Sequence, residues 1–447
     1  MSTTYPSISM VVGGETLTFS GEEVVTAVIT EELSPISVEI PISVFEFSII
    51  STDEDFSMFA GTHFNLLSER LPVTVYEYVD DVPYLIGRFY LDDWENTTEY
   101  TFKFKAIDII GVLAATEFDG GFWSTATTLK SIFADVLNPI DVEYTLDASI
   151  EDAEVQGWIP PGTYRDALQQ ICFAGMVVAS TTRSITLNFI GVSLPDVEYD
   201  SHILNENKFI NQPVKLLPLV TGIELVSHNY AEGDDPVEFF SEELAIGSYK
   251  IVFEQPYFDI SVTGPGYTPI LLTVEGGADT ITTEDGVDDI EVGGEYNFGP
   301  NSLYLNVQSA GLVTITGTPW VDSKRAFTYT EEGSEDFLNK LTLKVEDATL
   351  VSVDIAETVL GVMSDYYAQR YEQHIKLRPS EVKINDIVLT STLYDKHIIA
   401  IVQKMSLDLT GGFLAETDVL GSRYPGIYAT PGTYGITGTA AELEYSG

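Results

Sequence analysis

The chain has 447 residues, of which 44% are hydrophobic and 11% aromatic, a composition typical of folded domains and not of disordered chains. Its 69 Asp and Glu residues against 21 Lys and Arg residues give a formal net charge of −48. A field of this sign repels nucleic acids and anionic membrane surfaces, so neither is expected to bind.

The N-terminal stretch MSTTYPSISMVVGG has no basic segment followed by an apolar core, so we expect no signal peptide. No apolar run approaches the ~20 residues of a membrane span, so we expect no membrane insertion. The single cysteine, Cys172, excludes internal disulfides. It lies on an apolar helical stripe, which favours a buried side chain over a nucleophile. We therefore expect a soluble protein that is made and assembled in the cytoplasm.

Residues 1–112 read as a series of strands separated by turn signals. The segment Thr101 to Ile107 alternates apolar and polar residues, the period of a strand with one buried face. An antiparallel sandwich or barrel is the expected class.

The pattern changes at 113–205, which predicts a small α+β module. One amphipathic helix is expected at 126–137 and a second at 163–174, where Thr163 and Asp166 have the form of a capping box. A hairpin with its turn near Thr182-Arg183 follows. We expect the second helix to bury Leu168 and Ile171 within one chain.

Strands resume at 206–235 and continue through an acidic segment. Residues 226–300 contain 16 acids and one base, Lys250. The short strands of 236–320 predict a small acidic β subdomain.

From residue 321 the sequence pattern predicts strands, followed by the longest helix of the chain at about Asp354 to Leu377. Further strands follow at 381–413, with turns at Asn385-Asp386 and Tyr394-Asp395-Lys396. The tail, 421–447, has no periodicity and reads as extended.

No catalytic, cofactor-binding or metal-ligating residues can be named from motifs. The five histidines, His63, His202, His228, His374 and His397, have no metal-binding spacing, and the nucleophile-elbow, zinc-protease and P-loop patterns are missing. Calcium is an alternative at 276–295 through Glu284, Asp285, Asp288 and Asp289, although these acids lack the alternation of an EF-hand loop. A sugar site lined by Trp94, Trp123, Trp158 and Trp320 is a second alternative, although large aromatic residues are more often core or interface residues.

Two long runs resemble the baseplate hub (tail hub) proteins of phage and prophage tails. The first extends from RFYLDDW (88–94) to the helix and hairpin of GWIPPGTYRDALQQICFAGMVVASTTRSITLNF (157–189). The second contains DYYAQRY (365–371) and VKINDIVLTSTLYDKHIIAIVQKMSLDLTGGFLAETDVLG (382–421). Asn385 stands where this family usually has glycine, and asparagine tolerates the left-handed backbone that such a turn requires. The similarity covers most of 40–421.

The resemblance implies a structural virion protein of the phage tail baseplate and no enzyme. It implies a homotrimer in which each chain supplies two tail-tube-like β domains, so that three chains adapt a sixfold tail tube to a threefold tip. Expected partners are the tail tube protein and a central spike or tip protein, with the tape measure and the baseplate wedge or distal tail proteins as further candidates. DNA would pass through without specific binding during ejection, and a substantial part of the −48 would line the channel, including the first 69 residues, which lack Lys and Arg.

This architecture predicts that the chain is divided into five regions. Two other classes of function are kept as alternatives. The alternatives are a carbohydrate-binding or adhesin protein of a tail tip and, less favoured, a tail-associated hydrolase. We also expect the two tube-like domains to share one topology. The predicted regions are a first tube-like β domain at 1–112, the α+β module at 113–205, a second tube-like β domain formed by 206–235 plus 321–420, the acidic β subdomain at 236–320 and the tail at 421–447.

Overall fold

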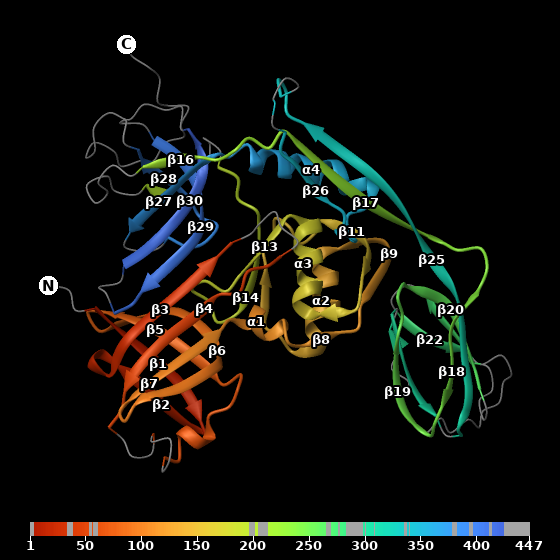
Figure 1. Ribbon diagram of the computed structural model, residues 1–447, viewed down its shortest axis with the longest axis horizontal. Coiled ribbons are helices and arrows are strands. Elements are labelled where there is room, and N and C mark those ends of the chain that lie inside the picture. Colours follow the sequence, from red (N-terminus) through yellow and green to blue (C-terminus); the bar gives the residue numbers. More distant parts are fainter. Residues whose placement is uncertain are drawn as a thin grey trace.

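The computed structural model is mainly β, with four α-helices in its described part, and the predicted fold class is confirmed (Figure 1). It describes residues 4–33, 39–52, 56, 61–195, 202–203, 213–264, 270–275, 278–282, 298–299, 301–307, 309–334, 338, 340–377, 382–392, 397–410 and 414–423. The calcium alternative at 284–289 and the turn at 394–396 lie outside these residues.

The main sheet has 13 strands and joins the two ends of the chain. Its order is β16-β27-β30-β29-β3-β4-β7-β6-β5-β1-β2, with β28 between β29 and β15. We call β1–β7 its first half and the remaining strands its second half. The first half contains β1 (Thr4–Val12), β2 (Glu15–Ser20), β3 (Val24–Glu32), β4 (Val44–Ile50), β5 (Pro72–Val79), β6 (Val82–Thr98) and β7 (Thr101–Ile107), with short 3-10 turns at Gly21–Glu23 and Phe64–Leu66. The second half contains β15 (His202–Ile203), β16 (Val214–Leu216), β27 (Tyr371–Leu377), β28 (Ile387–Ser391), β29 (His397–Asp408) and β30 (Leu414–Arg423).

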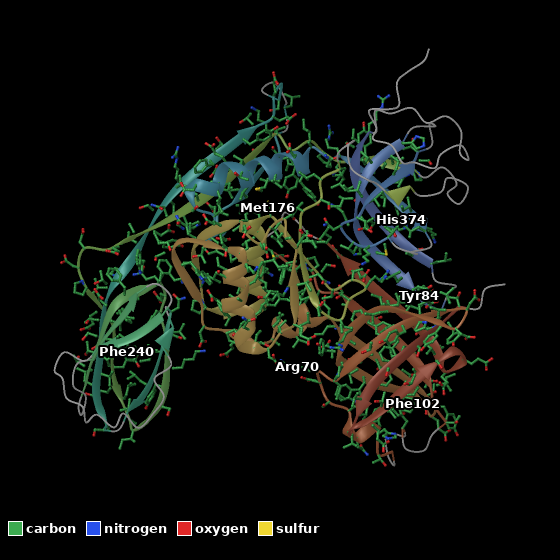
Figure 2. All side chains as sticks on the ribbon, turned by 180° about the vertical axis from the view of Figure 1, so that it is seen from behind. Arg70, Tyr84, Phe102, Met176, Phe240 and His374 are labelled. Atoms are coloured by element: carbon green, nitrogen blue, oxygen red, sulfur yellow. The ribbon has the colours of Figure 1, made fainter. Side chains whose placement is uncertain are left out.

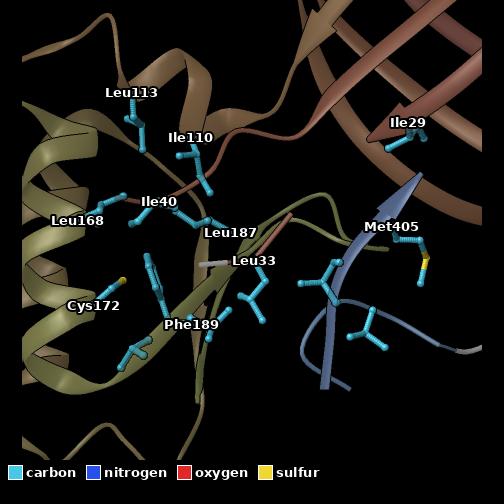
Figure 3. Packing of buried hydrophobic residues seen from close by; sticks show 14 of the residues in the cluster. Ile29, Leu33, Ile40, Ile110, Leu113, Leu168, Cys172, Leu187, Phe189 and Met405 are labelled. Carbon is cyan, nitrogen blue, oxygen red and sulfur yellow. The ribbon is translucent and has the colours of Figure 1, made fainter. Parts of the chain in front are cut away.

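The two halves meet where β29 pairs with β3. The antiparallel register aligns Lys404 with Glu32 and Met405 with Glu31. Figure 3 shows Met405 and Ile29 at this joint. One sheet therefore runs through both halves of a single chain.

The α+β module lies between the main sheet and the rest of the molecule, and its second predicted helix is confirmed. The Thr163 side chain accepts from the Asp166 N–H, and the Asp166 side chain accepts from the Thr163 N–H, which completes the capping box. The predicted hairpin turn is also present, with Arg183 in the left-handed region at φ 54°. The module contains α1 (Ile109–Leu113), β8 (Glu117–Phe118), β9 (Gly121–Thr128), α2 (Leu129–Leu137), a 3-10 turn (Asn138–Ile140), β10 (Tyr144–Leu146), β11 (Glu154–Ile159), β12 (Gly162–Thr163), α3 (Tyr164–Gly175), β13 (Val177–Ser180) and β14 (Leu187–Gly191).

The longest helix is shorter than predicted, and the extent to Leu377 was wrong. Helix α4 covers Val353–Tyr367, and Tyr371–Leu377 forms β27. Gln373, Ile375 and Leu377 are buried while the residues between them are exposed, which is the two-residue period of a strand. No helix in the described part of the chain combines the length and apolar character that a membrane span requires.

A long two-stranded ribbon leads to a distal β unit. β17 (Gly222–Glu232) pairs along its whole length with the second half of β25 (Gly311–Thr330), and Figure 1 shows this ribbon arching away from the main sheet. The distal unit has its own apolar core, with Ile260 and Ile315 fully buried. Its other strands, with β26 at the base of the ribbon, are β18 (Val237–Leu244), β19 (Gly247–Val252), β20 (Tyr257–Thr263), β21 (Ile270–Glu275), β22 (Ala278–Thr282), β23 (Phe298–Gly299), β24 (Ser302–Val307) and β26 (Thr342–Val345).

The distal unit contacts the α+β module mainly through polar groups. The Trp158 Nε1–H donates to the Asn301 Oδ1 at 2.7 Å, and Asn301 is fully buried. Lys250 forms ion pairs with Asp119 and Glu117. The single base of the 226–300 segment is thus used to hold the acidic unit against the body.

Asn385 closes the turn before β28 and ties it to the α+β module. It has φ 72°, its Oδ1 accepts from the Ser193 N–H at 3.2 Å, and its Nδ2–H donates to the Gly191 oxygen at 3.1 Å.

Asn385→Gly keeps the backbone conformation but loses both hydrogen bonds, each contributing about 0.5–1.5 kcal/mol to stability. Asn385→Ala should lose a further ~1 kcal/mol or more to left-handed strain. In urea unfolding we expect the parent to be the most stable protein, Asn385→Gly the next and Asn385→Ala the least stable. An Asn385→Gly variant more stable than the parent would contradict this role.

Candidate functional surface

One face of the main sheet carries charged side chains across eight successive strands. Because side chains alternate between the two faces of a strand, the register fixes which residues share this face. Lys404 of β29 lies opposite Glu32 of β3 and Asp418 of β30. Glu46 of β4 lies opposite Lys105 of β7. We call this surface the ion-pair face; its charged residues are Lys215, Glu372, His374, Lys376, Glu416, Asp418, Lys404, Asp408, Glu32, Glu46, Lys103, Lys105, Asp92, Asp93 and Glu95.

Ion pairs cross between neighbouring strands along this face. Lys105 Nζ lies 2.9 Å from an Asp92 oxygen, and Lys404 Nζ lies 3.0 Å from a Glu32 oxygen. The second half of the sheet continues the pattern, and Figure 2 shows His374 there on the strands drawn in blue. The remaining pairs are Lys215–Glu372 at 2.6 Å, Lys376–Glu416 at 2.5 Å and His374–Asp418 at 2.7 Å.

Two of these pairs favour the charged forms of Lys105 and Glu416. The hydrogen bond to Asp92 raises the pKa of Lys105, and the hydrogen bond from Lys376 lowers the pKa of Glu416. The side chains remain half-exposed, so each pair adds only about 0–1 kcal/mol to stability. The regular array therefore matters more for the surface that the sheet presents than for folding.

The ion-pair face is close to neutral compared with the rest of the protein. It carries five lysines against nine carboxylates, a formal −4 of the total −48 when His374 is neutral. From the first 69 residues, only Glu32 and Glu46 contribute charge to it in the described part of the chain. Most of the acid therefore lies on other surfaces.

Both ends of the face have open backbone edges. β5 and the two residues before it pair only with the first part of β6, up to Leu91, whereas the part from Asp92 to Thr98 pairs with β7 alone among the described residues. At the other end lies β16, whose described partner is β27. Open edges of this kind can accept a strand from another chain.

The histidines do not assemble a metal or catalytic site. His228 is buried, with Nδ1 2.7 Å from an Asp322 oxygen and Nε2 3.0 Å from the Glu346 carbonyl oxygen, so both ring nitrogens are engaged in structural contacts. His63 contacts Glu15, and no group of three potential ligands occurs in the part of the chain that the structure describes. The His202 side chain lies outside that part. Burial raises the pKa of the Cys172 thiol, which keeps it protonated and unreactive.

The four tryptophans do not form a common sugar-binding platform. Each is half-buried and lies in a different contact. Trp158 binds Asn301, Trp123 donates to Asp135, and Trp94 packs against the main core. Trp320 stacks obliquely on Phe122 at 4.9 Å between ring centroids, where the ribbon meets the module.

Comparison with known proteins gives matches in structure but not in sequence. No family model and no curated protein matches the sequence. Over 93% of the chain the fold is similar to 98% of the 43 kDa tail protein of prophage MuSo2 from Shewanella oneidensis, with 12% identity and a TM-score of 0.46. It is similar over 94% to 94% of prophage tail protein gp18 from Listeria monocytogenes, with 10% identity and a TM-score of 0.49. A tail protein from Neisseria meningitidis gives 94% and 97% coverage, 8% identity and a TM-score of 0.49. All three of these structures are tail proteins, the group that the sequence resembles.

Proposed function

We propose that the protein is a structural hub of a phage-type tail, in which three copies join into a ring and the ion-pair face lines the bore. The observation that carries this proposal is the continuous sheet with one charged, exposed face and open edges at both ends of it. Because the two edges differ, a head-to-tail contact between copies generates a ring when the rotation closes. The tail-hub resemblance of the sequence supports three copies, a tail tube above the ring and a spike or tip protein below it.

The ion-pair face suits a channel through which DNA slides. Binding to DNA gains its strength from free Lys and Arg side chains that neutralise phosphates. On this face Lys105, Lys376 and Lys404 are each already paired with a carboxylate. The small negative excess adds weak repulsion. Lys215 is paired as well, and Lys103, which has no ion pair among the described residues, lies opposite Glu95 on β6. A phosphate therefore finds few free cations to bind, and we propose an ion-paired, mildly acidic lining in place of a strongly acidic one.

The ring can be tested by substituting the open edge of β6. Thr97 lies at an irregularity in the β6–β7 register, between Asn96 and Thr98, and we expect the N–H of this extra residue to be available to an incoming strand. Thr97→Pro removes a donor that an incoming strand needs, and proline is tolerated at such positions. We expect mass photometry to give three times 49.2 kDa for the parent and a smaller species for Thr97→Pro.

Thr97→Ala is the matched control, because it shortens the same side chain but keeps the N–H. It should form the same oligomer as the parent. Both variants lose the hydrogen bond from the Thr97 hydroxyl to the Thr101 oxygen, so they should share one melting temperature, close to that of the parent. If Thr97→Pro still forms a trimer, β6 does not take part in the contact between copies. A parent protein that stays monomeric under all conditions would overturn the ring.

A further inference from the structure

A carboxyl group is buried at the joint between the two halves of the main sheet. Glu31 of β3 lies opposite Met405 of β29, and its side chain is only 3% exposed. The neighbouring Glu32 points to the opposite face and is half-exposed on the ion-pair face. Two adjacent glutamates thus have contrasting environments, and only Glu31 is enclosed by the joint.

The turn between β13 and β14 closes over this carboxyl group. An Arg183 guanidinium nitrogen lies 3.4 Å from the Glu31 Oε1. The Arg183 N–H donates to the Ile86 oxygen of β6 at 3.2 Å, which fixes the turn against the first half of the sheet. The Glu31 Oε2 and the second terminal nitrogen of Arg183 are buried without a hydrogen-bond partner among the described residues.

A second buried carboxyl group is bound by the same turn. Asp108, fully buried, caps α1 by accepting from the Gly111 N–H at 2.9 Å, and it also accepts from the Ser43 N–H at 3.0 Å. The Thr181 Oγ1–H donates to it at 3.3 Å. Two residues of this turn, Thr181 and Arg183, therefore hold the two carboxyl groups.

Charged groups from four elements face Glu31, and the charges of the buried ones among them do not add up to zero when all are ionised. Glu31 of β3, Asp108 at the start of α1 and Arg183 of the turn are enclosed, whereas Lys383, before β28, is exposed. Of the charged residues on β29 near the joint, Lys404 turns to the other face, where it pairs with Glu32. The enclosed part thus contains two carboxyl groups and one guanidinium, which contacts Glu31, whereas Asp108 is held by N–H and hydroxyl donors. Loss of hydration raises the pKa of Glu31 and of Asp108, and for Glu31 this outweighs the attraction of Arg183.

Water can reach the edge of this cluster. A cavity of about 430 Å³ is lined by Thr182, Arg183 and Lys383, with the carboxylates of Asp147 and Asp386 also in its wall. It lies between the turn and the loop before β28. The cavity provides a path along which a proton can enter or leave without unfolding the joint.

We propose that the Glu31–Asp108–Arg183 cluster holds a proton that locks the turn at 181–183 onto the β3–β29 joint, and that loss of this proton as the pH rises weakens the joint. A proton on one of the two carboxyl groups leaves a single buried negative charge in the cluster, which the one enclosed guanidinium balances. When the proton leaves, an uncompensated charge remains between the two halves of the sheet. The joint is then the part of the fold that opens first.

The direction of the pH effect follows from the raised pKa values. A carboxyl group whose pKa is higher in the folded state than in the unfolded chain stabilises the fold fully below its unfolded pKa, roughly 4. That stabilisation is lost as the pH rises through the folded pKa, with up to a tenfold change in the folding equilibrium for each pH unit and each proton released.

The test compares Glu31→Gln with Glu32→Gln in the full chain. Both variants replace one ionisable carboxyl group at adjacent positions, so the charge of the unfolded chain changes equally. Urea unfolding is measured from pH 5 to pH 8 at constant ionic strength. The parent and Glu32→Gln should lose stability on raising the pH more steeply than Glu31→Gln, by up to a tenfold difference in the folding equilibrium per pH unit. Parallel pH profiles for the two variants would overturn the proposal.

Two measurements on the parent remain decisive if Glu31→Gln does not fold. Infrared spectroscopy of the native protein at pH 7 should show the carbonyl band of a protonated carboxylic acid, and the band should vanish on unfolding. Hydrogen exchange, corrected for intrinsic rates, should show the Leu33 N–H, which donates to the Gln403 oxygen across the joint, losing protection between pH 6 and pH 8. A missing band, or protection that does not change with pH, would refute the held proton.

Discussion

Leu168→Ala is expected to lower the free energy of unfolding by about 2–5 kcal/mol. Leu168 and Ile171 of α3 are fully buried, which confirms the predicted apolar stripe. Figure 3 shows Leu168 and Cys172 on one side of α3, facing the layer that contains Phe189. Truncation leaves a cavity that a helix fixed at both ends cannot close, because α3 has a complete capping box and ends at Met176 in the left-handed region.

Gln169→Ala is the matched control for this effect. Gln169 is on the same turn of α3 but half-buried, so its truncation should change stability by no more than about 0.5 kcal/mol. Urea unfolding and thermal melting measure both variants. The oligomer mass of Leu168→Ala should stay that of the parent at low temperature. If Leu168→Ala proves as stable as Gln169→Ala, α3 is not the packing element of the module.

Gly421→Ala is expected to break the second half of the main sheet. A Cβ at this position would lie 1.9 Å from the Ile399 oxygen and 2.5 Å from the Ala400 Cα, both backbone atoms of β29. Overpacked side chains cost about 1–3 kcal/mol when a flexible neighbour can move. Here the paired strand itself must move, and β29 also carries the joint to β3. The loss should therefore reach or exceed the top of that range.

Gly361→Ala is a control that should change the stability of the protein in the opposite direction. Gly361 lies within α4, and a Cβ there would meet nothing within 4 Å. Alanine is favoured over glycine inside a helix by about 0.5–1 kcal/mol. Equilibrium unfolding should thus show Gly421→Ala destabilised and Gly361→Ala stabilised. A stable Gly421→Ala protein with an intact β29–β30 ladder, as judged by hydrogen exchange, would contradict this description of the second half.

Local patterns in the sequence predicted the elements that depend on nearby residues. Thr163 and Asp166 form their capping box three residues apart, and Asn385 adopts the left-handed backbone that its turn requires. The failure at Tyr371–Leu377 has a local cause as well. The helical stripe ending at Tyr366 was extended across a segment whose own two-residue alternation indicates a strand.

The candidate surface depends on pairings that the sequence does not reveal. Lys404 and Glu32 form an ion pair although they are 372 residues apart in the chain. When the strand register is not known, the acidic residues of β3 indicate a uniformly acidic surface. Alternation within β3 does place Glu31 on the same side as the buried Ile29, a signal that could have identified it as an enclosed carboxyl group.

Electron cryo-microscopy of the purified oligomer tests the proposed function most directly. We expect a threefold ring in which both halves of the main sheet surround a central bore and Glu46, Lys105 and Glu416 face that bore. The β6 edge of one copy should pair with the β16–β27 end of the next. A ring with the ion-pair face on its outer surface, or particles that contain only single chains, would contradict the hub.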